Sequence, residues 1–548
     1  MSSHDDFKQA IREHALKRRE DGHLIIAAEQ TGASAAWLFD LRALMLQPRW
    51  LNHYAELFWE RYETQYPFQV GSVETAGIAL VAAIVMKGVE RGTPVNGFFI
   101  RKSRKREGLM KSIEGTLTDE PVIFVDDLIN SGKTLAKQLE VLRRAGKSIT
   151  NIFVLLAFRN LDAYAFITDT HRTTLTALFT LKDFDLPLLR TDAAEVPKES
   201  FETLWHFEAQ KPSHHLVVQK SAPLLDEQRL FFGSDSGTFR ALSQATGELL
   251  WEYEVGRHPS GKGILSSPVL YKGVVYFGAY DGTVYALNAE TGKVRWTYAD
   301  ADWVGSSPAI APELGLLFIG LEFGLWRKQG GMVALSLATG ERKWEARTGS
   351  LTHGSPLYIP EEKIVVIGSN DGVVYAYNAA TGALQWHYQT GADVKASLAY
   401  DPKRRFVLFG SMDAKCYALS ARDGSPVFAR QMGAGIYSTP LIVGDTVYVA
   451  SLDKRLYAID LDTWHDRWAF ETSGRIFSSP VLIEDSLWIG SNDGRLYEID
   501  PHRGTLRHFF QTTERIVNRC AYNPHTKRFF VPTCANEIYC LKRKENGI

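Results

Sequence analysis

The hydrophobic and polar positions of this 548-residue chain follow two different patterns, and the change falls near residue 190. In the first part, short apolar runs rich in β-branched and aromatic residues alternate with longer stretches of helical periodicity. The expected strands are 68–71, 95–100, 122–125 and 152–158, and the expected helices include 5–20, 48–66 and 75–91. This alternation is typical of a parallel sheet flanked by helices, so we predict an α/β domain over residues 1–190.

After a polar, proline-containing linker at 191–202, the chain consists of repeats. Each repeat has the order strand, Asp-Gly turn, strand, Thr-Gly turn and a final strand entered by a tryptophan, as in 277–296 and 368–386. The tryptophan position recurs every 40 to 48 residues, and it is occupied by Trp251, Trp296, Trp344, Trp386, Phe428, Trp468 and His508. This period is typical of a four-stranded propeller blade.

The number of strands predicts the number of blades. Seven complete units end with His508, and an eighth unit at 528–543 lacks its tryptophan strand. The segment 204–207, Leu-Trp-His-Phe, has the missing pattern and stands just before the first repeat. Pairing of this strand with the last unit would close the ring without an exposed edge. We therefore predict an all-β propeller of eight blades over 203–548, and a seven-bladed ring with extra flanking strands is the alternative.

The segment 122–134 carries the most specific chemistry in the first part. A strand-like apolar run leads into Asp126 and Asp127, and a Ser-Gly-Lys-Thr turn then opens an amphipathic stretch at 135–145. The N–H groups and the dipole at a helix N-terminus attract anions, and paired carboxylates can accept hydrogen bonds from sugar hydroxyls. An NTPase P-loop is excluded because it needs glycine at the position of Asp127. The remaining alternative is an ordinary strand–turn–helix of an α/β protein.

This segment resembles the PRPP-binding motif of type I phosphoribosyltransferases, and residues 20–190 resemble orotate phosphoribosyltransferase in particular. Four further motifs stand in the order of that family. They are the aromatic stretch 37–42, the pyrophosphate-type loop 71–77, the basic loop 99–108 and the Ile-Glu-Gly at 113–115. The resemblance implies a phosphoribosyltransferase that uses Mg²⁺-PRPP and a nucleobase-like acceptor, and it implies a homodimer because the basic loop of the family reaches the neighbouring subunit.

The resemblance also implies a role for individual residues. Catalysis in this family is mostly the placement of charge around a cation-like transition state. The catalytic set is Asp126, Asp127, Arg101, Lys102 and Lys105, with Asp126 and Asp127 also placing Mg²⁺ through PRPP. The 5-phosphate loop is Asn130, Ser131, Gly132, Lys133 and Thr134, and the pyrophosphate loop is Glu74, Thr75, Ala76 and Gly77. Phe39 and Arg159 are expected to face the base. The alternative for 101–106 alone is a solvated basic loop or a nucleic-acid patch.

Three positions depart from the family pattern. Glu107 replaces the loop histidine, Gln30 replaces a lysine that contacts orotate or PRPP, and Ala76 replaces a glycine of the pyrophosphate loop. Glu107 puts negative charge where pyrophosphate should leave. Two functions therefore stay open: an active phosphoribosyltransferase, and a non-catalytic sensor of PRPP or a nucleotide. A redox enzyme centred on the propeller is a third and weaker hypothesis.

The repeats resemble the PQQ-like β-propeller family, whose Ala-x-(Asp/Asn)-x-x-Thr-Gly-x-x-x-Trp pattern recurs from about 203 to 543. Quinoprotein dehydrogenases of this family carry an adjacent cysteine pair and an acid-rich calcium site, whereas the four cysteines of this chain are all separated. We therefore do not expect PQQ, and we interpret the tryptophans as blade-to-blade packing. By analogy with the propeller lipoprotein of outer-membrane assembly, the ring is expected to recruit a protein partner of unknown identity or another ligand.

Composition limits the other functions. The 62 basic and 63 acidic residues balance, so we expect no nucleic-acid partner and no anionic membrane surface as partner. The polar N-terminus lacks a signal core, and the longest apolar run, 76–86, is too short to span a bilayer. Four scattered cysteines favour buried free thiols in a reducing compartment. The chain is accordingly expected to be cytoplasmic.

Overall fold

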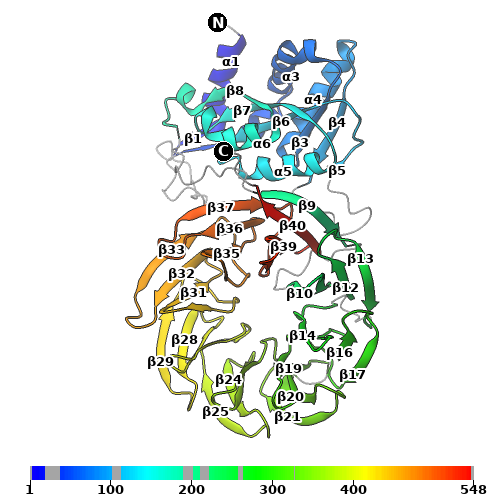
Figure 1. Ribbon diagram of the computed structural model, residues 1–548. Coiled ribbons are helices and arrows are strands. Elements are labelled where there is room, and N and C mark those ends of the chain that lie inside the picture. Colours follow the sequence, from blue (N-terminus) through cyan, green and yellow to red (C-terminus); the bar gives the residue numbers. More distant parts are fainter. Residues whose placement is uncertain are drawn as a thin grey trace. The chain divides into compact units, whose positions relative to one another are not determined.

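The computed structural model describes residues 3–18, 37–101, 113–188, 201–209, 221–256, 263–325 and 328–544. The chain divides into two compact units, Met1–Glu199 and Ser200–Ile548 (Figure 1). Among the described residues, no helix combines the length and the apolar character needed to cross a membrane. All four cysteines are buried and free, as predicted.

The first unit is built on a six-stranded sheet with the order β5-β4-β3-β6-β7-β8, parallel except for the antiparallel edge strand β5. The sheet strands are β3 (Gln69–Val73), β4 (Asn96–Ile100), β5 (Ile113–Glu114), β6 (Val122–Ile129), β7 (Ile149–Ala157) and β8 (Thr174–Thr180). A separate antiparallel pair is formed by β1 (Leu16–Arg18) and β2 (Trp37–Phe39). The helices are α1 (Ser3–Ala10), α2 (Leu41–Met45), α3 (Pro48–Tyr62), α4 (Ala76–Glu90), α5 (Lys133–Arg144) and α6 (Ala165–His171), with short π or 3₁₀ segments at Ile11–Ala15, Glu63–Gln65, Leu161–Tyr164 and Leu181–Phe184. The predicted parallel sheet flanked by helices, consistent with a phosphoribosyltransferase fold, is confirmed.

The central strands are apolar almost throughout because both faces of the sheet are covered. Successive side chains of a strand point to opposite faces. Ile123 and Val125 of β6 accordingly join the core that contains residues of α3 and α4, whereas Val122 and Phe124 join the core that contains residues of α5. Figure 1 shows these helices on the two sides of the sheet.

The order of the strands reverses between β3 and β6. From β3 the chain runs through α4 to the neighbouring β4, and it then returns to place β6 on the other side of β3. The register pairs Val73 with Ile100 and Ser72 with Val125, so the carboxyl ends of these strands lie at one edge. Ligands of open α/β sheets bind at such a switch point. The fold therefore directs attention to the carboxyl edge of β3, β4, β6 and β7.

The second unit consists of eight four-stranded antiparallel sheets arranged in a ring, which confirms the predicted eight-bladed propeller (Figure 1). Blade 1 contains β10 (Leu224–Leu225), β11 (Arg229–Gly233), β12 (Thr238–Ser243) and β13 (Leu249–Glu254), and blade 2 contains β14 (Val269–Tyr271), β15 (Val274–Gly278), β16 (Thr283–Asn288) and β17 (Val294–Ala299). Blade 3 contains β18 (Ala309–Ala311), β19 (Leu316–Phe323), β20 (Gln329–Ser336) and β21 (Arg342–Thr348), and blade 4 contains β22 (Leu357–Ile359), β23 (Ile364–Gly368), β24 (Val373–Asn378) and β25 (Leu384–Gln389). Blade 5 contains β26 (Ala399–Asp401), β27 (Phe406–Gly410), β28 (Lys415–Ser420) and β29 (Pro426–Gln431). Blade 6 contains β30 (Leu441–Val443), β31 (Thr446–Ala450), β32 (Arg455–Asp460) and β33 (Asp466–Glu471). Blade 7 contains β34 (Val481–Ile483), β35 (Ser486–Gly490), β36 (Arg495–Ile499) and β37 (Leu506–Gln511). The seven-bladed alternative is wrong.

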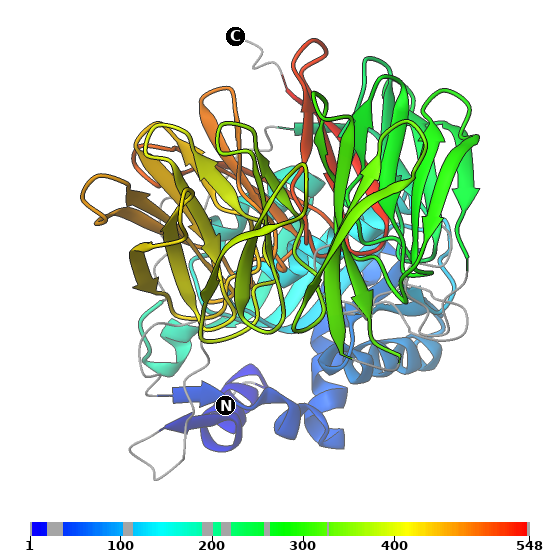
Figure 2. The ribbon, with the colours of Figure 1, turned by 90° about the horizontal axis from the view of Figure 1, so that it is seen from below.

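Blade 8 combines the two ends of the propeller sequence. It contains β38 (Ala521–Asn523), β39 (Arg528–Pro532) and β40 (Glu537–Arg543), and its outer strand is β9 (Phe201–Glu208) from before the first blade. The β9–β40 register runs from Glu208 opposite Glu537 to Phe201 opposite Arg543. Figure 2 shows the blades from the side as separate twisted sheets around the ring. Because β9 covers the last sheet, blade 8 has the same four strands as its neighbours.

A tryptophan on the outer strand of one blade locks that blade to the next. Trp251 donates its indole N–H to the carbonyl of Ala289 at 3.1 Å, and its ring covers Gly292, where a Cβ atom would lie 2.6 Å from the ring. Gly292 also has a φ of +69°, so glycine is required twice. The same indole-to-carbonyl bond is made by Trp205, Trp296, Trp344, Trp386 and Trp468. The interpretation of the tryptophans as blade-to-blade packing is confirmed.

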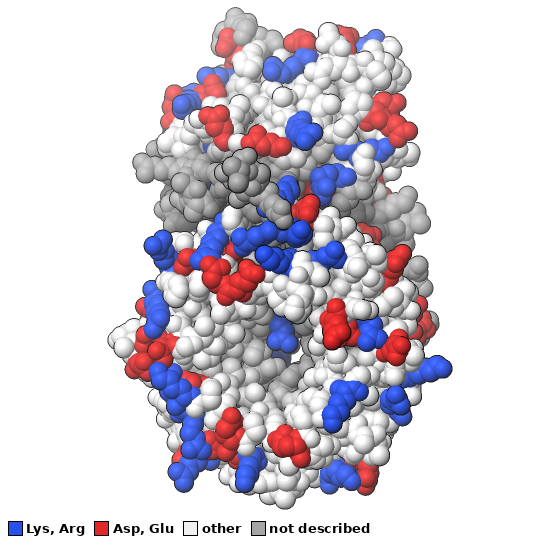
Figure 3. All heavy atoms as spheres, in the orientation of Figure 1, with Lys and Arg blue, Asp and Glu red and all other residues white. Residues whose placement is uncertain are grey.

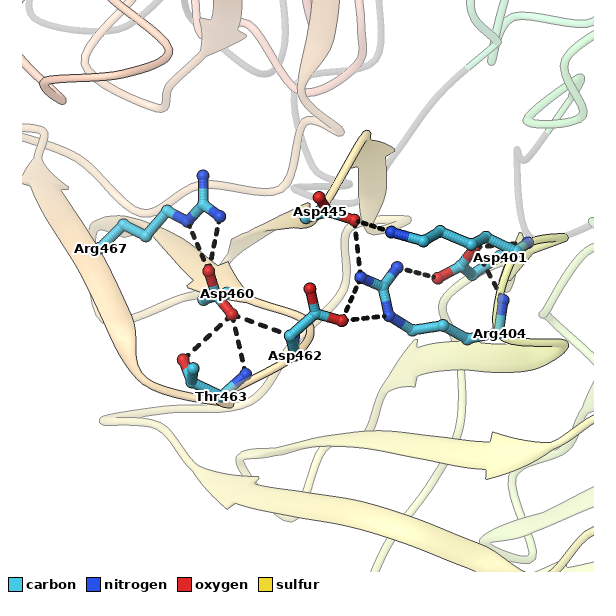
Figure 4. A network of polar contacts seen from close by, with 8 residues as sticks. Asp401, Arg404, Asp445, Asp460, Asp462, Thr463 and Arg467 are labelled. Atoms are coloured by element: carbon cyan, nitrogen blue, oxygen red, sulfur yellow. Dashed lines mark hydrogen bonds and ion pairs between the residues drawn. The ribbon is translucent and has the colours of Figure 1, made fainter.

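The lock between blades 5 and 6 has different residues. Phe428 stands at the tryptophan position, and Trp464 stands at the turn position that glycine occupies in the other locks described above, with a φ of +59°. The two rings stack with centroids 4.2 Å apart. Arg404 of blade 5 also binds Asp445 and Asp462 of blade 6, at 2.7 and 2.5 Å (Figure 4). The tryptophan of this contact therefore lies in the turn of blade 6, where the other locks have glycine, and a phenylalanine takes its place on the outer strand of blade 5. The ion pairs of Arg404 lie at the same joint between the two blades.

Candidate functional site

The carboxyl edge of the parallel sheet brings together the sequence motifs of the first unit. Residues 74–77 follow β3, Arg101 follows β4, residues 130–134 follow β6, and Arg159 stands two residues after the end of β7. Asp126 and Asp127 lie in the last half of β6. These segments are far apart in sequence, and the switch point makes them neighbours.

Asp126 and Asp127 are both half-buried at this edge of the sheet. The backbone N–H of Asp127 donates to Oδ1 of Asp126 at 2.9 Å, and the N–H of Leu128 donates to Oδ1 of Asp127 at 2.8 Å. Burial raises the pKa of the Asp127 carboxyl above its usual value, while the Asp126 side chain, the Leu128 N–H and the charge of Arg42 act in the opposite direction. The pair can accept hydrogen bonds from hydroxyl groups or supply oxygen ligands to a hard cation.

The loop after β6 is shaped by Gly132. Its φ is +75°, and α5 begins at the next residue. A Cβ atom at Gly132 would lie 2.8 Å from Cδ1 of Ile167, so a larger residue is excluded by backbone conformation and by packing. Ser131 is half-buried and Thr134 is exposed, whereas the side chain of Lys133 lies outside the described part. The first N–H groups of α5 have no acceptor within the helix, which suits an anion at this end.

Tyr164 holds this loop in place through its hydroxyl group, a role that the sequence did not predict. Its hydroxyl oxygen lies 2.8 Å from the carbonyl of Asn130 and 3.0 Å from that of Ile129, and it accepts the Arg159 N–H at 3.3 Å. Burial raises the pKa of Tyr164 to about 12, so the hydroxyl remains a donor. One side chain thus ties the loop after β6 to the end of β7. Tyr164 stands in a short 3₁₀ segment without a motif, so the sequence contains no signal for this role.

The loop after β3 is tightly packed against the ends of β3 and β4. Ser72 is buried and donates its hydroxyl to the Val125 carbonyl at 2.6 Å. A Cβ atom at Gly77 would lie 1.6 Å from Oγ of Ser72, so only glycine fits there. The Glu74 N–H donates to the carbonyl of Ile100 at 3.1 Å, and the peptide between Glu74 and Thr75 is cis. Ala76 replaces the family glycine at the first position of α4, where the structure accommodates it in a regular helix.

Part of the predicted basic set can be located. Arg101 contacts Oε1 of Glu114 at 3.0 Å and lies 3.9 Å from Oε2 of Glu74 in the pyrophosphate-type loop. The predicted Lys102 and Lys105, together with the departures Glu107 and Gln30, lie outside the described residues. Of the three predicted cations, Arg101 is the one within the described residues, and it lies at the site edge.

The two residues expected at the base differ in their surroundings. Phe39 is 6% exposed and packs against the rings of Trp37, Phe158 and Phe184, with centroids 5.7, 5.9 and 5.3 Å away. Its ring is thus part of the core of the unit. Arg159 is half-buried just beyond β7, and its N–H is held by Tyr164. Contact of either residue with a base stays a prediction.

The comparisons with known proteins agree with the repeat analysis. The family model described as outer membrane protein assembly factor BamB matches residues 194–359 and 370–521, which is more than half of the chain. The chain belongs to this family. The match covers most of the propeller, ends before β39 and β40 of blade 8, and includes no described residue of the α/β unit.

The N-terminal part is similar to curated orotate phosphoribosyltransferases. The enzyme of Bradyrhizobium sp. (strain BTAi1 / ATCC BAA-1182) is 28% identical over 131 residues, which cover 23% of this chain and 71% of the relative. The enzyme of Pyrococcus furiosus is 26% identical over 136 residues, or 25% of this chain and 71% of the relative. The chain thus joins a phosphoribosyltransferase-like region to a PQQ-like propeller.

Solved structures support the propeller fold. BamB from Moraxella catarrhalis aligns with a TM-score of 0.51 and 17% identity, covering 64% of this chain and 99% of that one. Quinohemoprotein alcohol dehydrogenase from Comamonas testosteroni aligns with a TM-score of 0.54 and 15% identity, covering 64% and 78%. At these identities the likeness shows the fold alone.

Proposed function

We propose that the α/β unit binds Mg²⁺-PRPP at the carboxyl edge of its sheet and transfers the phosphoribosyl group to a nucleobase-like acceptor. The observation that carries this proposal is the meeting of Asp126, Asp127 and the two loops 74–77 and 130–134 at the switch point. The similarity to orotate phosphoribosyltransferases supports the same ligand.

Each loop suits one part of PRPP. The 5-phosphate would lie on the N–H groups of 130–134, which Gly132 and Tyr164 hold in place. The ribose hydroxyls would be bound by Asp126 and Asp127, and the pyrophosphate would lie at 74–77. Two half-buried carboxylates fit Mg²⁺, which prefers oxygen ligands. The bound ion would neutralise part of the pyrophosphate charge.

The transfer itself exchanges one bond at C1 of the ribose. The bond from C1 to the pyrophosphate oxygen breaks, pyrophosphate leaves with the electron pair, and a nitrogen of the acceptor forms the new bond. Positive charge develops on the ribose, so the negative carboxylates of Asp126 and Asp127 would stabilise the transition state. Arg101, with Lys102 and Lys105 from the basic loop, would neutralise the leaving group. In this proposal the basic loop serves a neighbouring subunit, and the protein is a homodimer.

A sensor without transfer is the second candidate. Glu107 and Gln30 replace residues that the resemblance assigns to pyrophosphate and substrate, and Arg101 is engaged by Glu114. These changes affect the leaving group and the acceptor more than the ribose and the 5-phosphate. The site would then bind PRPP or a nucleotide and report its presence.

We propose that the propeller is a scaffold for a protein partner. The family model refers to a protein assembly factor, and repeated locks give a rigid ring. Figure 3 shows acidic and basic side chains interspersed on the drawn face of the ring and a hollow at its middle. Mixed charge favours a specific protein contact over a nucleic-acid surface. A cytoplasmic location is part of this proposal.

One assay separates the two candidates. The full chain is incubated with Mg²⁺ and PRPP, with and without orotate or uracil, and pyrophosphate release is measured beside PRPP binding by calorimetry. Base-dependent release supports the enzyme, and PRPP binding without release supports the sensor. Asp126→Asn with Asp127→Asn should abolish either signal, whereas the exposed Asp169→Asn should retain it. Absence of PRPP binding to the wild-type chain contradicts the transfer proposal.

A further inference from the structure

Blade 8 contains a cluster of one histidine and two glutamates at its closing strand pair. Glu208 of β9 lies directly opposite Glu537 of β40, and His206 lies two residues before Glu208, on the same face of β9. One potential ligand atom from each of the three side chains lies within 4.8 Å of the other two. Glu537 is 1% exposed, so one carboxylate is taken almost completely out of water.

The same position differs in the other seven blades, all within the described residues. In blade 6 Arg455 stands opposite Glu471 and binds it at 3.1 Å. In blade 7 Arg495 stands opposite Gln511 and donates to it at 3.0 Å. The remaining pairs are Thr238 with Glu254, Thr283 with Ala299, Gly331 with Arg347, Val373 with Gln389, and Lys415 with Gln431. Only blade 8 places two acids face to face.

Two carboxylates directly opposite each other destabilise a strand pair, and burial of one of them increases the cost. A cation between them reverses the sign of the interaction. A protonated His206 is one possible cation, since its Nδ1 lies 3.6 Å from Oε1 of Glu208. A metal ion is another, because imidazole nitrogen and carboxylate oxygen are both ligands of Zn²⁺ and Mn²⁺.

The surroundings are suited to a metal. Thr533 donates its hydroxyl to Oε2 of Glu537 at 2.9 Å, which orients the carboxylate in the way that outer hydrogen bonds orient metal ligands. The ring of His206 lies against that of Tyr539, with centroids 4.3 Å apart, so its orientation is restricted as well. Two of the three ligand side chains are thus oriented by neighbouring groups.

We propose that His206, Glu208 and Glu537 bind a divalent transition-metal ion that joins β9 to β40 and strengthens the closure of the propeller. Three protein ligands leave the remaining coordination positions to water. Because two ligands come from before the first blade and one from the last strand, the ion links the two ends of the ring sequence. An ion that binds only the folded ring stabilises it by mass action.

The test uses the full chain, stripped of metal with a chelator and dialysed. Calorimetry with Zn²⁺ and Mn²⁺, run without PRPP in the Asp126→Asn/Asp127→Asn background to remove the other proposed cation site, should show one site, and His206→Ala should weaken Zn²⁺ binding at that site at least about tenfold. The matched control is His387→Ala, because His387 follows Trp386 in blade 4 as His206 follows Trp205, but the pair beside it is Val373 with Gln389. This control should bind Zn²⁺ like the wild type.

A second variant provides the test if His206→Ala folds poorly. Glu537→Arg recreates the Arg–Glu pair of blade 6, so the ring should fold without metal. Saturating Zn²⁺ should raise the unfolding temperature of the wild type by at least about 3 °C and leave that of Glu537→Arg unchanged. The proposal is overturned if the wild type binds no Zn²⁺, if His206→Ala binds it equally, or if Mg²⁺ gives the same shift as Zn²⁺.

Discussion

The two units place their important residues in opposite ways. In the α/β unit, four segments that follow β3, β4, β6 and β7 lie at one edge of the sheet, around the switch point between β3 and β6. In the propeller, one contact recurs around the ring, and Trp205, Trp251 and Trp386 make the same bond at different blades. The first arrangement occurs once in the part of the chain that the structure describes. The second distributes stability over many equivalent positions.

This difference determines whether the sequence of each unit predicts a ligand or only a fold. A unique site needs particular residues in a particular order, so motifs such as 122–134 point to a ligand. A repeated lock requires only that the same packing recurs, so it predicts a fold and no ligand. The stacked rings of Phe428 and Trp464 show that different residues can make the contact between two neighbouring blades.

Removal of one lock should cost the propeller most. Trp386 is 6% exposed and covers Gly424 of the next blade, so Trp386→Ala should lower the free energy of unfolding by about 3–5 kcal/mol. Phe428→Ala should cost less, because its ring is half-buried and the ion network of Arg404 remains. Denaturant unfolding followed by tryptophan fluorescence measures both. Equal losses would show that the exchanged lock is as tight as the ordinary one.

A glycine of the switch point provides the corresponding test in the α/β unit. In Gly77→Ala the added Cβ would overlap the Ser72 side chain on a buried strand, so we expect about 1–3 kcal/mol of destabilisation and loss of PRPP binding. Gly92→Ala is the control, because nothing lies within 4 Å of its Cβ position and only its φ of +74° opposes alanine. If both variants lose PRPP binding equally, the close approach of 74–77 to β3 is not what shapes the site.

Much of the fold and part of the site could be predicted from the sequence. The sheet, the eight blades and the tryptophan packing follow from local periodicity, and the motif residues 126–134 fall at the expected edge. Phe39 shows the limit, because an aromatic residue in a motif can bind a base or fill the core, and here its ring is buried. Tyr164 and the pair Glu208 with Glu537 depend on contacts between distant segments, which no local pattern contains.

Tyr164 tests whether the site depends on a residue that does not itself bind the ligand. Tyr164→Phe keeps the ring and removes the hydroxyl beside the Asn130 carbonyl, so the free energy of unfolding should fall by about 1–3 kcal/mol. PRPP affinity should fall as well, because the 5-phosphate loop loses its tie to β7. Tyr66→Phe is the control, since Tyr66 is an exposed tyrosine of the same unit. Unchanged PRPP affinity in Tyr164→Phe would show that the loop holds its shape without the hydroxyl.

The smallest effect is expected at the ion network that accompanies the exchanged lock. Lys403→Gln removes the bond to Asp445 at 2.6 Å, a pair whose side chains are both exposed, so the loss should be at most about 1 kcal/mol and should shrink in high salt. Arg404 is not the residue to change, because it also binds the buried Asp401 at 2.8 Å.

Lys403 and Arg404 lower the pKa of Asp445 in the folded state. A lowered pKa stabilises the fold above the unfolded value of about 4 and stops doing so as the pH falls through the folded value. The difference between wild type and Lys403→Gln should therefore be constant near neutral pH and should narrow below about pH 4. Arg422→Gln, at an exposed arginine of the same blade, should show neither dependence. A salt-independent loss in Lys403→Gln would mean that packing of the lysine side chain, and not its charge, supports the joint between blades 5 and 6.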